Sequence, residues 1–195
     1  YALSVHEKLS GLFPNDEFIL TGAFRRQLEI IEKLEWVTTV APDTLSSFFT
    51  TNGFEIVDTE EGYISFCGKE NVTMGFYVTD ADYLYNQLFA TSCSPEFLQH
   101  FMEQTGWDVS NPYNSEEEIF EDCNCSFIPP YLREVDTIIE KGLNNTLPDV
   151  IQTSSIKGII HSHSNWSDGN NTLEEMANAC IDKGLEYLVI SDHSK

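Results

Sequence analysis

The sequence predicts two regions of different fold class, an α+β region over residues 1–142 and a βαβ unit over residues 157–195. In the first region the expected strands and helices follow one another without strict alternation, which is typical of an α+β fold. In the second region a strand, a helix and another strand follow in the order of a parallel βαβ crossover. A polar run from Gly142 to Pro148 indicates the boundary, and residues 143–156 are expected to form a linker.

Helices and strands of the first region are predicted from hydrophobic spacing and from turn and capping residues. Residues 28–40 fit a helix and a strand equally well, although the β-branched and aromatic side chains at 36–40 favour a strand at the end. The other expected elements are helices over 2–13, 43–51, 80–89, 94–104 and 115–120, and strands over 17–20, 54–57, 63–67 and 72–78.

Two histidines follow the first strand of the second region. Gly158 to Ile160 predict a short buried strand, and residues i and i+2 of a strand share one face, so His161 and His163 are expected to hold one cation between them. The turn Ser167-Asp168-Gly169 can bring a carboxylate toward the same ion. Imidazole and carboxylate ligands together suit zinc, manganese or iron.

A second pair of polar residues is expected at the same edge. Thr172 is a predicted N-cap for a helix that ends before Gly184, and residues 185–190 predict a second strand. Because parallel strands joined by a crossover end at one edge, Asp192 and His193 are expected beside His161 and His163.

These motifs, His161-Ser162-His163 with Ser167-Asp168-Gly169 and Asp192-His193, resemble the first two motifs of the polymerase-and-histidinol-phosphatase (PHP) family of metal-dependent phosphoesterases. The resemblance covers residues 157–195 and implies the first βαβ unit of an α/β barrel that holds a cluster of metal ions. It implies metal-ligand roles for His161, His163, Asp168 and His193. The position of Asp192 binds a metal or orients its neighbour, and both roles stay open.

The PHP unit is expected to be incomplete, because a full cluster needs further ligands from later strands and the sequence ends at Lys195. Two strands and one helix leave sheet edges unpaired and an apolar face uncovered. We therefore expect a longer parent protein. The alternative is a homodimer that shields the open edge.

A second resemblance spans the first region. Gly22-Ala23-Phe24-Arg25-Arg26 and Pro129-Pro130-Tyr131-Leu132-Arg133-Glu134 resemble motifs of the bacterial and archaeal family X DNA polymerases that carry a PHP module. Those proteins run Gly-Ser-x-Arg-Arg into a strand with Asp-x-Asp, and Pro-Pro-x-Leu-Arg-Glu precedes their PHP module. The resemblance implies that residues 1–142 are a divergent, nucleotidyltransferase-like palm and thumb region.

The departures from that pattern predict an inactive polymerase site. Nucleotidyl transfer needs carboxylates that hold two Mg²⁺ ions, but Lys33-Leu34-Glu35 stands at the Asp-x-Asp position and Thr73 or Met74 at the third carboxylate. Mg²⁺ is therefore not expected there. The alternative is a working polymerase that uses Glu32 and Glu35.

Two charged clusters have a functional and a structural interpretation. Arg25 and Arg26 could contact a phosphate, but a basic pair near Glu29 and Glu32 is more often a solvated ion-pair face, which we prefer. Residues 116–118, three glutamates, are expected in the first turn of a helix and not at a metal site.

Charge and cysteine usage limit the partners and the compartment. The formal net charge is −22, of which residues 1–150 carry −19 (7 Lys and Arg against 26 Asp and Glu), and such a surface repels nucleic acid. DNA contact is therefore expected only through the intact parent. Five cysteines without a Cys-x-x-Cys pair, and no signal peptide or long apolar run, predict a cytoplasmic protein without membrane contact.

The predicted function is that of a metal-dependent phosphoesterase in the intact parent. The resemblance suggests 3′-5′ exonuclease-like trimming of DNA ends in repair, and the present chain by itself is expected to be inactive. The competing hypothesis is a non-catalytic, acidic scaffold that binds a protein partner.

Overall fold

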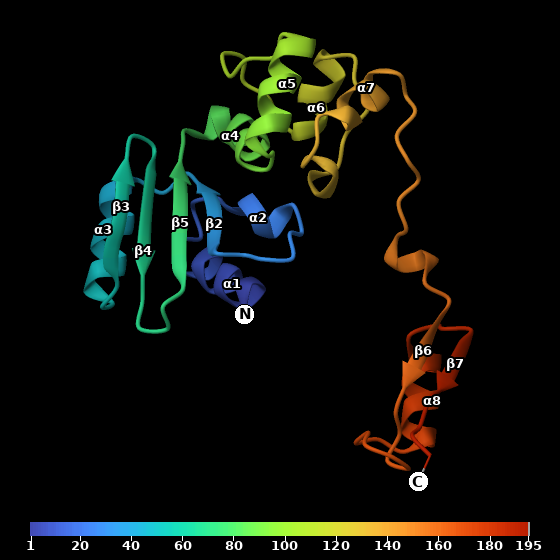
Figure 1. The fold of residues 1–195 in the computed structure, drawn as a ribbon. Helices are drawn as coiled ribbons and strands as arrows, with labels where there is room; N and C mark the ends of the chain where they lie inside the picture. The colour runs from blue at the N-terminus through green and yellow to red at the C-terminus, as the bar shows by residue number, and fades with distance from the viewer. Residues whose placement is uncertain (195) are drawn as a thin grey trace. The chain divides into compact units, whose positions relative to one another are not determined.

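The computed structural model describes residues 1–194 and divides the chain into two compact units, Tyr1–Leu147 and the residues from Pro148 onward (Figure 1). Each unit has its own β-sheet. The first unit contains a five-stranded sheet and most of the helices, and the second contains a two-stranded sheet with one α-helix.

The sheet of the first unit is mixed. Its strand order is β1-β2-β5-β4-β3, in which β2 and β5 are parallel and the other neighbours are antiparallel. The strands are β1 (Phe18–Thr21), β2 (Lys33–Thr38), β3 (Glu55–Glu60), β4 (Tyr63–Cys67) and β5 (Thr73–Val78).

One face of this sheet carries an aromatic core. Leu34 and Trp36 of β2 alternate with residues that point to the other face, and they pack with Phe76 of β5 beneath helices α1 (Ala2–Leu12) and α3 (Pro42–Thr51). Trp36 and Phe76 are fully buried and stack with ring centroids 5.4 Å apart. Because side chains alternate along β2, those of Lys33, Glu35 and Val37 point to the opposite face of the sheet.

The opposite face is partly covered by helix α4 (Leu84–Thr91), whose Leu84 and Leu88 pack on Val37. Helix α4 also contributes to a second core, in which Phe89 contacts the rings of Phe101 and Phe120. The helices of this second core lie close together in Figure 1. They are α4, α5 (Pro95–Thr105), α6 (Glu116–Asp122) and α7 (Thr137–Leu143).

The second unit is a parallel βαβ arrangement, as its sequence predicts. Strand β6 (Gly158–Ser162) pairs with β7 (Tyr187–Ile190), and helix α8 (Leu173–Asp182) connects them. Thr172 caps α8 in a reciprocal capping box with Glu175.

Three features of the first unit differ from the expected elements. The short helix α2 (Gly22–Arg25) and helix α7 were not predicted, and residues 28–32 form neither a regular helix nor a strand. Leu143 and Leu147 pack against the second core, so the first residues of the expected linker lie in the first unit.

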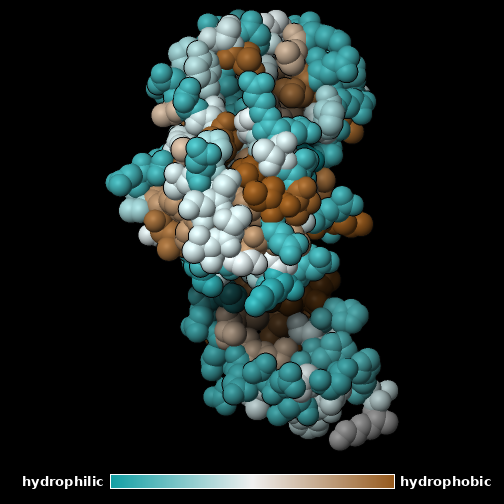
Figure 2. Space-filling view, turned by 90° about the vertical axis from the view of Figure 1, so that its left-hand side faces the viewer, coloured by the Kyte–Doolittle hydropathy of each residue, from teal (hydrophilic) through white to brown (hydrophobic). Residues whose placement is uncertain are grey.

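On the face shown in Figure 2, hydrophilic side chains surround patches of hydrophobic ones. In the second unit Ile160, Trp166 and Ile181 are each at least two-thirds exposed. Among the described residues, no helix has the length and the apolar character that a membrane span requires.

Candidate functional site

Three of the predicted metal ligands meet in the second unit. His163, Asp168 and His193 each offer a nitrogen or oxygen atom, and these atoms lie within 4.8 Å of one another. Asp168 Oδ1 is 3.1 Å from His163 Nδ1, and Asp168 Oδ2 is 3.5 Å from His193 Nε2. The turn after β6 and the segment after β7 therefore bring their polar side chains together, as the parallel βαβ order predicts.

His161 is placed differently from the prediction. It belongs to β6, but its φ of 66° breaks the pleat, the β6–β7 register shifts between Ile159 and Ser162, and the strand ends before His163. The expected i and i+2 relation along a regular strand is therefore wrong. The rings of His161 and His163 are still neighbours, with centroids 5.3 Å apart, but His161 is not one of the three residues grouped within 4.8 Å.

Asp192 holds the turn that carries Asp168. Its carboxylate accepts hydrogen bonds from the Ser164 backbone N–H at 2.6 Å, from the Ser164 hydroxyl and from the Ser167 hydroxyl at 2.7 Å. Gly169 closes the turn, because a Cβ there would lie 2.0 Å from the His163 carbonyl oxygen. Of the two roles left open for Asp192, orientation of its neighbours is the one that these contacts support.

Hydrogen bonds from the serine residues of this turn also lower the pKa values of the two aspartates. The Ser167 hydroxyl lowers the pKa of the Asp168 carboxyl, and nearby His163 and His193 lower that pKa further. Hydrogen bonds from Ser164 and Ser167 lower the pKa of Asp192. Both carboxylates are therefore ionised at neutral pH, which is the form that binds a cation.

The surroundings of His163 Nδ1 indicate that His163, Asp168 and His193 fit a metal ion. This nitrogen is buried and makes no hydrogen bond of good geometry within the described structure, although Asp168 lies close. A buried polar atom without a partner is costly, and metal ligation through neutral imidazole would satisfy it. The donor set of two imidazoles and a carboxylate suits zinc, manganese or iron.

A second group of possible ligands was not predicted from the sequence. Glu96 and His100, which are four residues apart on α5, lie with Asp136 so that one ligand atom of each is within 4.8 Å of the others. The i, i+4 spacing was a usable signal, but Asp136 comes from a distant segment. His100 Nδ1 is 3.0 Å from the Glu96 carbonyl oxygen and 3.5 Å from Asp136 Oδ2, so this nitrogen already has neighbours.

The expected polymerase position lies on the face of the large sheet away from α1 and α3. In the parallel β2–β5 register, Lys33 pairs with Thr73 and Glu35 with Gly75. Lys33, Glu35 and Thr73 are therefore neighbours, whereas Met74 belongs to the aromatic core. Of the two residues considered for the third carboxylate position, Thr73 is the one beside Lys33.

Glu35 is already engaged within the protein. Lys33 Nζ lies 2.9 Å from Glu35 Oε1, and the Tyr77 hydroxyl donates a hydrogen bond of 2.9 Å to the same oxygen. Burial acts to lower the pKa of Lys33, but the Glu35 carboxylate outweighs it and raises that pKa above its ordinary value. Burial and the Glu35 charge raise the pKa of Tyr77. The buried Glu35 carboxylate is therefore ion-paired with the Lys33 ammonium and hydrogen-bonded to the Tyr77 hydroxyl.

Arg25 and Arg26 form ion pairs, but not with the expected partners. Arg25 pairs with Glu116 and also donates a 2.8 Å hydrogen bond to the Ser92 hydroxyl, while Arg26 pairs with Glu134. These partners come from α6 and from the segment after residue 132, so they are distant in sequence. The expected pairing with Glu29 and Glu32 is therefore wrong, because the arginines point to the helical part of the unit.

Glu116 also pairs with Arg133, which is fully buried. Arg133 Nη1 lies 2.6 Å from Glu116 Oε1, and Arg133 Nε donates a 2.7 Å hydrogen bond to the Ile128 carbonyl oxygen. The rings of Phe89, Phe120 and Phe127 surround the guanidinium at 5.1–5.4 Å. The two motifs that carry the second resemblance thus meet through Glu116, and their arginines have structural partners. Glu116 also begins α6, as predicted for residues 116–118.

Comparison with curated proteins gives a distant relative. The DNA polymerase/3′-5′ exonuclease PolX of Bacillus subtilis (strain 168) is 27% identical over 220 aligned residues. The alignment covers 100% of this chain and 37% of the relative, so the chain spans little more than a third of that protein's length. A scan against models of known protein families gives no match. The similarity agrees with the predicted relation to family X polymerases.

Proposed function

We propose that the second unit supplies part of a divalent-metal site for phosphoester hydrolysis in a longer parent protein. The observation that carries this proposal is the convergence of His163, Asp168 and His193 within 4.8 Å. His163 and His193 would hold the ion through imidazole nitrogens and Asp168 through a carboxylate oxygen, with His161 close by. A bound metal would supply an activated water and stabilise charge on the phosphoryl oxygens.

Metal content tests the site directly. The purified chain is dialysed against zinc, manganese or iron(II) and then against buffer, and bound metal is measured by elemental analysis. We expect retained metal that is lost in the double variant His163→Ala, His193→Ala. His6→Ala, which changes a histidine of α1, is the matched control and should retain it. Equal metal content in the double variant and the control would overturn the proposal.

The nature of the relative suggests the substrate. The similar Bacillus protein is described as a DNA polymerase and a 3′-5′ exonuclease. We therefore propose DNA ends as the substrate of the parent and DNA repair as the setting. In the full-length parent, His163→Ala should abolish metal-dependent removal of 3′ nucleotides from a labelled oligonucleotide, whereas His6→Ala should leave it unchanged.

The large sheet, in this proposal, does not catalyse nucleotidyl transfer. Its one buried carboxylate, Glu35, is neutralised by Lys33, and Thr73 offers no charge. Glu32 precedes β2 and is exposed, and among residues 1–194 Glu35 belongs to no group of three clustered ligands. Primer extension with Mg²⁺ by the full-length parent would contradict this part of the proposal.

The second candidate function is an acidic scaffold for a protein partner. It is favoured by the net charge of −19 on residues 1–150 and by the ion-paired state of Arg25 and Arg26. Tight, salt-sensitive binding of gapped DNA by this chain would argue against it, because such binding requires free basic side chains.

The two strands of the second unit expose apolar side chains that another segment of protein could cover. Ile160 and Val189 of its two strands are exposed, and we propose that further chain of the parent protein covers them. A homodimer is the alternative, and sedimentation of this chain at two concentrations distinguishes them. The cytoplasm stays the predicted compartment, since the five cysteines are free thiols in the described structure.

A further inference from the structure

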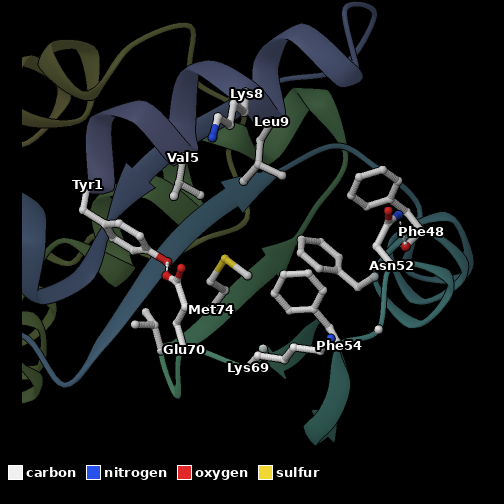
Figure 3. A pocket seen from close by; sticks show the side chains of 14 residues that line it. Tyr1, Val5, Lys8, Leu9, Phe48, Asn52, Phe54, Lys69, Glu70 and Met74 are labelled. Carbon is white, nitrogen blue, oxygen red and sulfur yellow. Dashed lines mark hydrogen bonds between the residues drawn. The ribbon is translucent and has the colours of Figure 1, made fainter.

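A pocket of about 480 Å³ lies between α1, α3 and the connection from β4 to β5 (Figure 3). Its wall is mainly apolar, and the volume is in the range of small-molecule sites. The apolar side chains include Val5, Leu9, Phe48, Phe54, Val72 and Met74. The pocket is on the aromatic-core face of the sheet, and neither candidate site described above contributes to it.

Two of the polar side chains that line this pocket are lysines. Residues 1–147 contain seven lysines and arginines, and Arg25, Arg26, Lys33 and Arg133 form ion pairs. Of the three others, Lys8 and Lys69 both line the pocket, and within the described residues neither forms a salt bridge. Figure 3 shows Lys8 on the α1 wall and Lys69 on the opposite side, beside Phe54.

The acidic side chain of the pocket is engaged. The Tyr1 hydroxyl donates a hydrogen bond of 2.9 Å to Glu70 Oε2, and this contact raises the pKa of Tyr1 (Figure 3). Asn52 is the remaining polar side chain that lines the wall. Two lysines against one glutamate give this pocket a net positive charge in a chain of net charge −22.

We propose that the pocket binds an amphipathic anion, an alkyl carboxylate of medium chain length. Its alkyl chain would lie against Leu9, Phe54 and Met74, and its carboxylate would pair with the ammonium group of Lys8 on one side of the pocket or of Lys69 on the other. A nucleobase fits less well, because most of its polar edges would face the apolar wall, and the amide nitrogen of Asn52 already donates a hydrogen bond to the Phe48 carbonyl oxygen. The apolar floor and the cationic rim therefore select a ligand with a single anionic end.

Calorimetric titration of the chain with decanoate tests the proposal. We expect one binding site, weakened at least about tenfold in the double variant Lys8→Gln, Lys69→Gln, because that variant removes both cationic side chains of the pocket. Lys141→Gln removes the remaining lysine of residues 1–147 that forms no salt bridge; it lies on α7 and does not line the pocket, so this variant should bind decanoate as the wild type does.

Two further measurements separate the pocket from nonspecific binding. Decyltrimethylammonium has the same alkyl chain with the opposite charge and should not bind. Val5→Phe should fill the pocket and abolish decanoate binding, and circular dichroism confirms that the variant is folded. The proposal is overturned by absence of decanoate binding, by equal binding to the double-lysine variant, or by binding of the cationic analogue at the same site.

Discussion

Glu116 is a buried carboxylate between two arginines that are far apart in the sequence. Arg25 comes from α2 next to the sheet, and Arg133 from the segment between α6 and α7. Breaking a buried ion pair on one side leaves an uncompensated charge, which is far more destabilising than losing a surface pair. This side chain therefore ties the sheet to the helices within the first unit.

Glu116→Gln should reduce the free energy of unfolding of the first unit by about 3–5 kcal/mol, since it leaves the buried guanidinium of Arg133 and the partly buried guanidinium of Arg25 without their counter-charge. Urea unfolding monitored by tryptophan fluorescence measures the change. Glu117→Gln, at the exposed neighbouring position, is the matched control and should change the stability little. Equal midpoints for the two variants would contradict the structural role of Glu116.

The same residue predicts a pH dependence. Burial acts to raise the pKa of Glu116, but Arg25 and Arg133 outweigh it, and the pKa lies below its ordinary value of 4.5. Because the folded state has the lower pKa, the stabilisation is complete above about pH 4.5 and is lost as the pH falls through the folded pKa. Urea midpoints between pH 3 and 7 should therefore fall more steeply on the acid side in the wild type than in Glu116→Gln.

Gly22 allows the close approach of α2 to Glu35. Its φ is +63°, and a Cβ would lie 2.1 Å from Glu35 Oε2, so Gly22→Ala should combine backbone strain with a clash. Gly53 has a φ of +83° in open space, so Gly53→Ala should show the strain alone, about 1–2 kcal/mol. Urea unfolding should give a larger loss for Gly22→Ala, and Glu35→Ala in the same chain should recover part of it.

At the scale of elements, the turn between β6 and α8 depends on Asp192. This carboxylate accepts two hydrogen bonds from Ser164 and one from Ser167, so the end of β7 holds the turn that presents Asp168. Asp192→Ala should expose the turn and increase amide hydrogen exchange at Ser164 and Trp166. Asp182→Ala, in the last turn of α8, is the control. Unchanged exchange in Asp192→Ala would mean that the turn is held by other contacts.

Most elements follow from local pattern, and the exceptions have physical reasons. Helices such as α5, with its Ser94 cap, and strands β4 and β5 match their predicted ranges within about two residues, since capping and alternation are local signals. The four-residue helix α2 and the helix α7 carry weak local signals. Residues 28–32 stay irregular, because their side chains are mostly exposed and do not share one buried face.

In the candidate sites too, some features follow from the sequence and others depend on contacts between distant segments. The βαβ order correctly brings the segments around His163 and His193 together, because crossover connections fix which strand ends meet. The break at His161 is not visible in the sequence, since a bulge depends on pairing with β7. The partners of Arg25 and Arg26 are also not visible, because they lie 91 and 108 residues away.

At the scale of the whole molecule, the net charge of −22 opposes the folded state through mutual repulsion of carboxylates. Salt screens this repulsion, so raising NaCl from low to moderate concentration should raise the thermal midpoint by a few degrees, at about 2–4 °C per kcal/mol for a chain of this size. Glu60→Gln with Glu61→Gln, at exposed positions of one hairpin, should reduce the effect. A midpoint that falls with salt would show that ion pairs outweigh repulsion.

The Lys33–Glu35 pair on β2 limits what a single substitution on this face of the sheet can achieve. Its parallel neighbour β5 places uncharged Thr73 beside Lys33, so a cation site on this face would need new carboxylates on both strands. Lys33→Asp alone would set a second carboxylate beside buried Glu35 without its ammonium, which costs stability before any ion is held. A single substitution at Lys33 therefore lowers stability without creating a cation site, and such a site would need several changes made together.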